Sequence, residues 1–278
     1  SRSEVIIAVV GGSSARDFKT SYQETGAAIA DEKSISDMEC GEGFDRATLT
    51  LLGKQQDLLN ALKATGKPLI VVYIEGRPLD KVWASEYADA LLTASYPGQE
   101  GGYAIADVLF GDYNPAGRLP VSVPRSVGQI PVYYNKKAPC NHDYVEQAAS
   151  PLYTFGYGLS YTTFEYSDLQ VMRKSPCYFE VSFKVKNTGS YDGEEVAQLY
   201  LRDEYASVVQ PLRQLKCFER FFLKRGEEKE IFFTLTEKDL SIIDRNMKRV
   251  VETGDFRIMI GASSDDIRLT KDISVESL

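Results

Sequence analysis

The segment Glu39-Cys40-Gly41-Glu42-Gly43-Phe44-Asp45-Arg46 holds the side chains of this sequence that are best suited to acid–base chemistry. A carboxyl group can serve as a general acid or base. The glycines on either side of Glu42 allow the backbone to hold that carboxylate in a cramped or exposed site. Asp45 and Arg46 could pair with each other or orient a ligand hydroxyl through charge-assisted hydrogen bonds. Taken alone, however, one carboxylate in a glycine-rich loop is usually just a solvated turn.

Other common catalytic and metal-binding patterns have little support. The sequence has one histidine, His142, and no G-x-S-x-G motif, which argues against a Ser-His-Asp apparatus. No two cysteines form a CxxC pair, so the spacing of a zinc site is absent. We therefore expect no metal. The four cysteines are Cys40, Cys140, Cys177 and Cys217.

A nucleotide site is not expected either. Gly156-Tyr157-Gly158-Leu159-Ser160-Tyr161 has a tyrosine in place of the third glycine of a dinucleotide fingerprint, and it precedes β-patterned sequence. A dinucleotide needs the amino terminus of a helix for its pyrophosphate. The interpretation is a structural turn, and no cofactor is expected.

Charge and hydropathy restrict the partners. The formal net charge is 32 − 40 = −8, which argues against a nucleic-acid binder that depends on counterion release and against adhesion to anionic membranes. The apolar runs, such as residues 5–10, are much shorter than the roughly 18–20 residues of a membrane span. We expect neither a nucleic-acid nor a membrane partner.

The elements around the Glu42 segment indicate an α/β layer structure with a mostly parallel sheet. Strands are predicted at residues 5–10, 68–74 and 89–94, and the β-branched run at 68–74 is typical of a strand buried on both faces. Helices are predicted at 51–65, where Leu58, Leu59 and Leu62 have helical spacing, and at 100–110. These strands are few for a complete domain, so we expect its first strands to precede residue 1.

The rest of the chain has a different pattern. Residues 126–160 are rich in proline and tyrosine, which indicates a connecting segment without regular structure. After Tyr161 the apolar residues alternate, as in Tyr178-Phe179-Glu180-Val181-Ser182-Phe183-Lys184-Val185. About seven such strands with intervening turns predict an antiparallel β-sandwich.

Several ordered blocks of the sequence resemble the carboxyl-terminal part of glycoside hydrolase family 3, which includes β-glucosidases and β-xylosidases. The blocks together extend over nearly the whole chain. They are residues 41–46, 66–72, 96–120, 155–164, 186–189 and 261–267.

The resemblance implies a division of the chain into three parts. Residues 1–125 would be a partial α/β sandwich domain, residues 126–160 the connecting segment, and residues 161–278 a fibronectin-III-like β-sandwich. The family's amino-terminal catalytic barrel, which carries the nucleophilic aspartate, would be a partner outside this chain.

The resemblance also assigns a role to one residue. The family's Glu-Gly-x-Asp-Arg pattern places the general acid/base at Glu42, with Glu39 as the nearby competitor. The implied function is a retaining, exo-acting β-glycosidase that removes terminal β-linked sugars from oligosaccharides or glycosides. We expect the chain alone to be inactive, because it lacks the nucleophile.

Two further expectations follow. Export to the periplasm or secretion is implied by the resemblance alone, and the choice between glucosides and xylosides stays open. The alternative function is a non-catalytic accessory module that binds carbohydrate or a protein partner.

Overall fold

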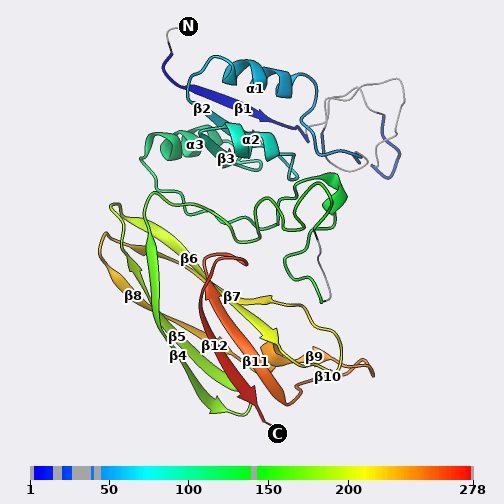
Figure 1. The fold of residues 1–278 in the computed structure, drawn as a ribbon, viewed down its shortest axis with the longest axis vertical. Helices are drawn as coiled ribbons and strands as arrows, with labels where there is room; N and C mark the ends of the chain where they lie inside the picture. Colours follow the sequence, from blue (N-terminus) through cyan, green and yellow to red (C-terminus); the bar gives the residue numbers. More distant parts are fainter. Residues whose placement is uncertain (1–2, 15–20, 27–38, 41–44, 139–142, 277–278) are drawn as a thin grey trace. The chain divides into compact units, whose positions relative to one another are not determined.

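The computed structural model describes residues 3–14, 21–26, 39–40, 45–138 and 143–276. The chain divides into two compact units. The first contains residues 1–110 and 123–131, and the second contains residues 111–122 and 132–278. Each unit is described by itself (Figure 1).

The first unit is an α/β structure with a three-stranded parallel sheet in the order β1-β2-β3. Helix α1 lies alongside β1 and β2 (Figure 1). The elements are β1 (Ile6–Gly11), α1 (Gln55–Lys63), β2 (Leu69–Ile74), α2 (Val82–Tyr87), β3 (Ala90–Thr93), α3 (Gly101–Phe110) and the 3-10 turn η1 (Val127–Gln129).

The strands of this sheet differ in burial. In β2, Leu69, Val71 and Val72 are completely buried, as predicted for a strand covered on both faces. In β1 only alternate residues are buried, and Ile7 and Val9 remain 44% and 61% exposed. One face of β1 is therefore packed and the other is open.

Helix α1 explains part of this packing. Leu59 is completely buried, and Leu62 packs partly buried against the same core, as their spacing predicts. Leu58 is 49% exposed and does not belong to this core. The cluster that receives Leu59 also contains side chains of β1 and β2 and Ala84 of α2.

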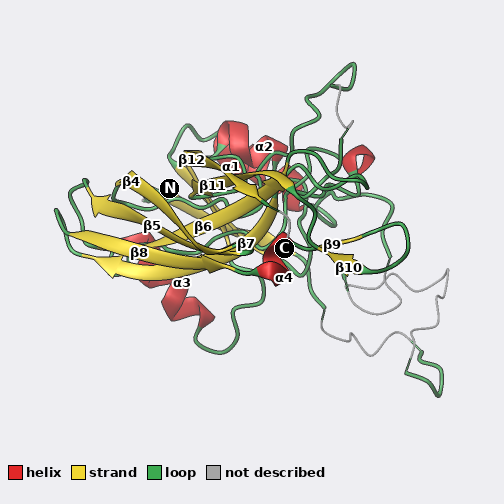
Figure 2. Ribbon diagram, turned by 90° about the horizontal axis from the view of Figure 1, so that it is seen from below, coloured by secondary structure: helices red, strands yellow, loops and turns green. Residues whose placement is uncertain are grey.

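The second unit is a sandwich of seven strands in two antiparallel sheets, as predicted. One sheet has the order β12-β11-β6-β7, and the other has the order β4-β5-β8. The strands of both sheets are drawn in yellow in Figure 2. The seven strands are β4 (Phe164–Ser175), β5 (Tyr178–Asn187), β6 (Gly193–Asp203), β7 (Gln214–Leu223), β8 (Glu228–Leu235), β11 (Gly254–Gly261) and β12 (Ile267–Val275).

Alternation of side chains forms the sandwich core. Val181 and Phe183 of β5 point inward, as do Leu199 of β6 and Ile258 of β11, and all four are completely buried. Three short elements lie between β8 and β11. They are α4 (Glu237–Leu240), β9 (Ile242–Ile243) and β10 (Arg249–Val250).

The connecting segment lies along the sandwich rather than forming strands of it. The Phe155 ring stacks on Tyr134 at 4.1 Å, and Tyr134 contacts Tyr200 of β6 edge to face at 6.1 Å. The Gln198 amide donates to the carbonyl oxygens of Gly156 and Ala262, at 3.3 and 2.6 Å. Gly156 has a φ of +81°, which is consistent with the predicted turn.

The predicted fold class, α/β followed by all-β, is confirmed. No helix among the described residues has the length and apolar composition needed to cross a bilayer.

Candidate functional site at the carboxyl edge of the parallel sheet

The three parallel strands of the first unit end at one edge of their sheet. β1 ends at Gly11, β2 at Ile74 and β3 at Thr93. Loops that leave this edge carry the chemistry in open α/β sheets. We call the polar residues gathered there, together with the two glycines that pack against them, the carboxyl-edge cluster. Its members are Gly12, Glu39, Cys40, Arg46, Glu75, Gly76, Arg77, Lys81 and Tyr96.

Glu39 lies at the centre of this cluster and is completely buried. Its backbone N–H donates to the carbonyl oxygen of Ser13 at 2.7 Å. Arg46 Nη1 donates to Glu39 Oε1 at 3.0 Å, and Arg77 Nε lies 3.7 Å from the same oxygen. Glu39 Oε2 has no hydrogen-bond partner among the described residues. Glu39 thus acts as a buried anion that joins two guanidinium groups, which is the form in which a charge tolerates burial.

Two glycines allow this close arrangement. A Cβ atom at Gly12 would collide with the side chain of Glu39, and one at Gly76 would collide with Cys40 Sγ and the Tyr96 ring. A side chain at either position would push the Glu39–Cys40 segment away from the strand ends.

Tyr96, which follows β3, fixes the second residue of that segment. Its hydroxyl donates to the Gly12 carbonyl oxygen at 3.1 Å and lies 2.9 Å from Cys40 Sγ. Either group can be the donor in the contact between the Cys40 thiol and the Tyr96 hydroxyl. Partial burial and the neighbouring thiol raise the pKa of Tyr96 above its ordinary value, so the hydroxyl remains a donor at neutral pH.

A buried ion pair closes the loop that follows β2. Lys81 is 1% exposed, and its Nζ lies 2.6 and 2.7 Å from the two carboxylate oxygens of Glu75. Glu75 Oε2 also accepts the backbone N–H of Leu79 at 3.0 Å, and Lys81 Nζ lies 4.5 Å from the Tyr73 ring centroid. Burial lowers the pKa of Lys81, and the charge of Glu75 opposes this shift.

The candidate residues named from the sequence have different outcomes. Glu42 lies outside the described residues, as do His142 and Cys140. Glu39 is described and belongs to the cluster. Arg46 binds Glu39 and Thr48, and no ion pair joins it to Asp45 in the described part of the chain.

The sequence analysis missed Glu75, Arg77, Lys81 and Tyr96. A signal was available for the first two, because Glu75-Gly76-Arg77-Pro78 directly follows the buried strand at 68–74, at the sheet edge where chemistry is expected. Among the described residues, no group of three or more His, Cys, Asp or Glu side chains could hold a metal ion.

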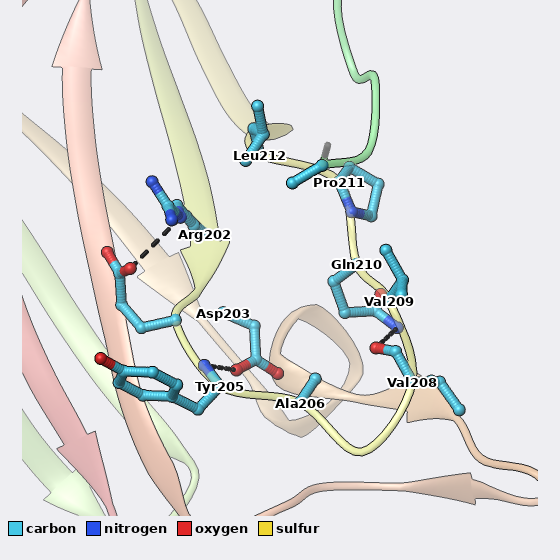
Figure 3. A pocket seen from close by; sticks show the side chains of 11 residues that line it. Arg202, Asp203, Tyr205, Ala206, Val208, Val209, Gln210, Pro211 and Leu212 are labelled. Carbon is cyan, nitrogen blue, oxygen red and sulfur yellow. Dashed lines mark hydrogen bonds and ion pairs between the residues drawn. The ribbon is translucent and has the colours of Figure 1, made fainter. Parts of the chain in front are cut away.

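The second unit contains a pocket of about 230 Å³ (Figure 3). It is lined by Ala138 and by residues 202–206 and 208–212, which belong to the end of β6 and the loop that follows. Arg202 pairs with Glu204, and the Gln210 amide folds back onto the Val208 carbonyl oxygen at 3.2 Å (Figure 3). Asp203 accepts the Tyr205 N–H at 3.2 Å, and burial raises the pKa of its carboxyl group. Most of the polar groups here are already partnered.

Family models match both parts of the chain. Residues 1–161 match the glycosyl hydrolase family 3 C-terminal domain, and residues 195–264 match the fibronectin type III-like domain.

Two relatives show the extent of the similarity. The chain is 46% identical to a periplasmic beta-glucosidase of Salmonella typhimurium over 82% of its own length and 32% of that protein. It is 45% identical to a beta-xylosidase of Formosa agariphila, with 82% and 33% covered. The chain therefore spans about a third of the length of the curated relatives that it matches.

Solved structures agree with this result. The structure of a beta-glucosidase from Listeria innocua in complex with glucose superposes with a TM-score of 0.85 and 32% sequence identity. The superposition covers 99% of this chain and 37% of the Listeria chain.

Proposed function

The chain belongs to glycosyl hydrolase family 3, and we propose that it is the carboxyl-terminal portion of a retaining, exo-acting β-glycosidase. In this proposal it supplies the general acid/base, Glu42, to a catalytic barrel outside the chain. The ordered match to the family model across residues 1–161 is the observation that carries the proposal.

The chemistry defines what Glu42 would do. Retaining glycosidases use two carboxyl groups about 5–5.5 Å apart, one as nucleophile and one as acid and then base. Glu42 would protonate the leaving sugar oxygen and then deprotonate the water that releases the glycosyl-enzyme intermediate. The nucleophile would come from the barrel.

The environment of Glu39 supports Glu42 over this competitor. A general acid must reach the leaving oxygen and lose its proton to it. Glu39 is completely buried, and two arginines contact its carboxylate. A residue with these partners is better suited to hold a loop than to transfer a proton to substrate.

The substrate class and location follow the relatives. Similar proteins carry the names beta-glucosidase and beta-xylosidase, so terminal β-linked glucose or xylose is the proposed substrate. A periplasmic or secreted location is proposed by analogy with the Salmonella protein.

The test uses the full-length glycosidase, meaning this chain joined to its barrel, with Glu42→Gln and Glu39→Gln compared. For Glu42→Gln, kcat/KM on a disaccharide should fall roughly 10²–10⁴-fold. On a dinitrophenyl glycoside the Glu42→Gln variant should keep most of the kcat/KM, because this leaving group needs no protonation. Azide, which needs no general base, should raise kcat on the activated substrate.

Full activity of both variants on disaccharides would overturn the proposal. If Glu39→Gln alone gave the selective loss and the azide rescue, the acid/base would be Glu39. The purified 278-residue chain should hydrolyse neither substrate, and turnover that disappears with Glu42→Gln in that chain would contradict the need for a barrel.

A second candidate function is carbohydrate binding by the second unit, and the pocket of Figure 3 is the observation that favours it. Asp203 and Arg202 offer an acceptor and donors to sugar hydroxyls. Titration of the chain with xylo- and gluco-oligosaccharides should then give sub-millimolar binding that Asp203→Ala abolishes and Glu180→Ala, on the other sheet, leaves unchanged. No saturable binding would remove this candidate.

A further inference from the structure

The charged members of the carboxyl-edge cluster tie together the two ends of one short segment. Glu39 and Arg46 lie seven positions apart in sequence, and their side chains meet at 3.0 Å. Residues 41–44, including Glu42, lie between them in the chain. A contact at the base of a loop reduces the number of conformations that the loop can adopt.

Arg77 connects the Glu39–Arg46 ion pair to the ends of the strands. Its Nε lies 3.7 Å from Glu39 Oε1, the oxygen that also accepts Arg46. Arg77 comes three residues after the end of β2, and the preceding Gly76 packs against Cys40 and Tyr96. The position of Glu39 thus depends on the position of the loop after β2.

The Lys81–Glu75 pair determines the shape of that loop. Glu75 binds the Leu79 N–H and the Lys81 ammonium group, so the two ends of residues 75–81 are held together around Arg77. The Asp80 N–H donates to Leu49 O at 2.7 Å, and the Tyr73 hydroxyl donates to Asp80 O at 3.1 Å. Every contact in this series involves a group that is buried or partly buried.

Stability alone does not explain such a series. Replacing a buried ion pair by well-packed apolar side chains is often neutral or stabilising, so the pair is weak evidence for a role in stability. The buried Glu75–Lys81 pair is better explained by a requirement that the loop of residues 75–81 keep one defined geometry.

We propose that Arg77, held by the Glu75–Lys81 loop and acting through Glu39, is a positioning residue for the segment that carries Glu42. This inference rests on the proposed function. In this proposal Arg77 acts through Glu39, and its effect is to keep the acid within reach of the leaving oxygen. A misplacement of about 1 Å costs roughly 100-fold in rate.

The experiment uses the full-length glycosidase with Arg77→Met, Arg77→Lys, Glu39→Gln and Glu42→Gln. The readout is the ratio of kcat/KM for a disaccharide to kcat/KM for the dinitrophenyl glycoside. Arg77→Met should lower this ratio roughly 10- to 100-fold, and azide should raise its kcat on the activated substrate. Arg77→Lys should restore part of the ratio, because it keeps the positive charge.

A matched control comes from the second unit. Arg118 Nη2 and Glu195 Oε1 form a buried ion pair at 2.6 Å. Arg118→Met should reduce stability and leave the ratio unchanged. The inference would fail if Arg77→Met lowered both kcat/KM values equally, because Arg77 would then be merely structural. It would also fail if Arg118→Met changed the ratio as much as Arg77→Met does.

The two proposals fail differently. If Glu42→Gln does not lower the ratio, the proposed function fails and the inference fails with it. If Glu42→Gln lowers the ratio and neither Arg77→Met nor Glu39→Gln does, only the positioning role is overturned. Using the ratio keeps the test valid even where a variant yields less folded enzyme, because both rates fall with the amount of protein.

Discussion

The two units bury different kinds of side chain. The sandwich has an apolar core built from both sheets, and Glu195, paired with Arg118, is its buried charged residue among the described positions. The smaller first unit buries Glu39, Glu75 and Lys81, all at the carboxyl edge of its parallel sheet. Apolar burial stabilises a fold roughly in proportion to area, whereas buried charges need partners in defined places. We therefore expect the sandwich core to contribute mainly stability and the charges at the sheet edge to contribute mainly a defined geometry.

The largest loss of stability is expected when one of these buried charges loses its partner. Lys81→Met leaves Glu75 buried without its partner and should lower the free energy of unfolding by about 3–5 kcal/mol. The urea denaturation midpoint of the chain, followed by circular dichroism, measures this.

The double variant Lys81→Met/Glu75→Leu makes the comparison sharper. It should recover most of the lost stability, because no charge remains unpaired. A double variant as unstable as the single one would show that the pair itself is required for folding.

A sandwich-core variant tests the other side of the comparison. Leu199→Ala removes a completely buried side chain of β6 and should cost about 2–5 kcal/mol. In the proposed full-length glycosidase, the ratio of kcat/KM for a disaccharide to kcat/KM for the dinitrophenyl glycoside should stay unchanged. The reason is that no charge at the sheet edge is affected. A reduced ratio would break the division between a stabilising unit and a positioning unit.

A smaller effect is expected at the cap of α4. The Thr236 N–H and hydroxyl both donate to Asp239 Oδ2, at 2.9 and 2.8 Å, in a capping box. Thr236→Ala should cost about 1 kcal/mol. Thr234→Ala, at an exposed position on β8, is the matched control, and an equal loss in both variants would exclude the cap as the cause.

The smallest effect concerns pH and a half-buried group of the sandwich. Arg220, together with the Tyr113 hydroxyl, lowers the pKa of Glu194 below its ordinary value of 4.5. The unfolded chain therefore binds this proton first, so the stabilisation is present above pH 4.5 and disappears as the pH falls through the lowered pKa.

The Glu194–Arg220 pair should contribute a few tenths of a kcal/mol to the free energy of unfolding, as other partly exposed ion pairs do. Glu194→Gln and Arg220→Met should each flatten the acid side of the stability curve, measured by urea unfolding between about pH 5 and pH 3. An unchanged acid limb in both variants would contradict this assignment.

The fold could be predicted from local patterns. The continuous apolar run at residues 68–74 became β2 (Leu69–Ile74), and the alternation from Tyr178 became β5 (Tyr178–Asn187). Patterns of this kind report burial directly. The short helix α2 (Val82–Tyr87) was not predicted, because six residues give too little periodicity.

The candidate site was less accessible to sequence reasoning. Glu39 and Arg46 are near each other in the chain, but Arg77 and Tyr96 meet the Glu39–Cys40 segment only because three parallel strands end at one edge. A pairing between residues 38 positions apart depends on topology, which no local pattern contains. The burial of Lys81 was hidden for a related reason, since lysine is almost never fully buried unless it is paired.

The open face of β1 has a practical consequence for work with the isolated chain. In the described residues β1 pairs with β2 on one side only, and Ile7 and Val9 are exposed on one of its faces. A strand of this kind offers unpaired backbone groups and an apolar surface to any other strand that meets it. Concentrated preparations of the isolated chain will tend to self-associate through β1. A lysine in place of Val9 is the simplest way to discourage such aggregation.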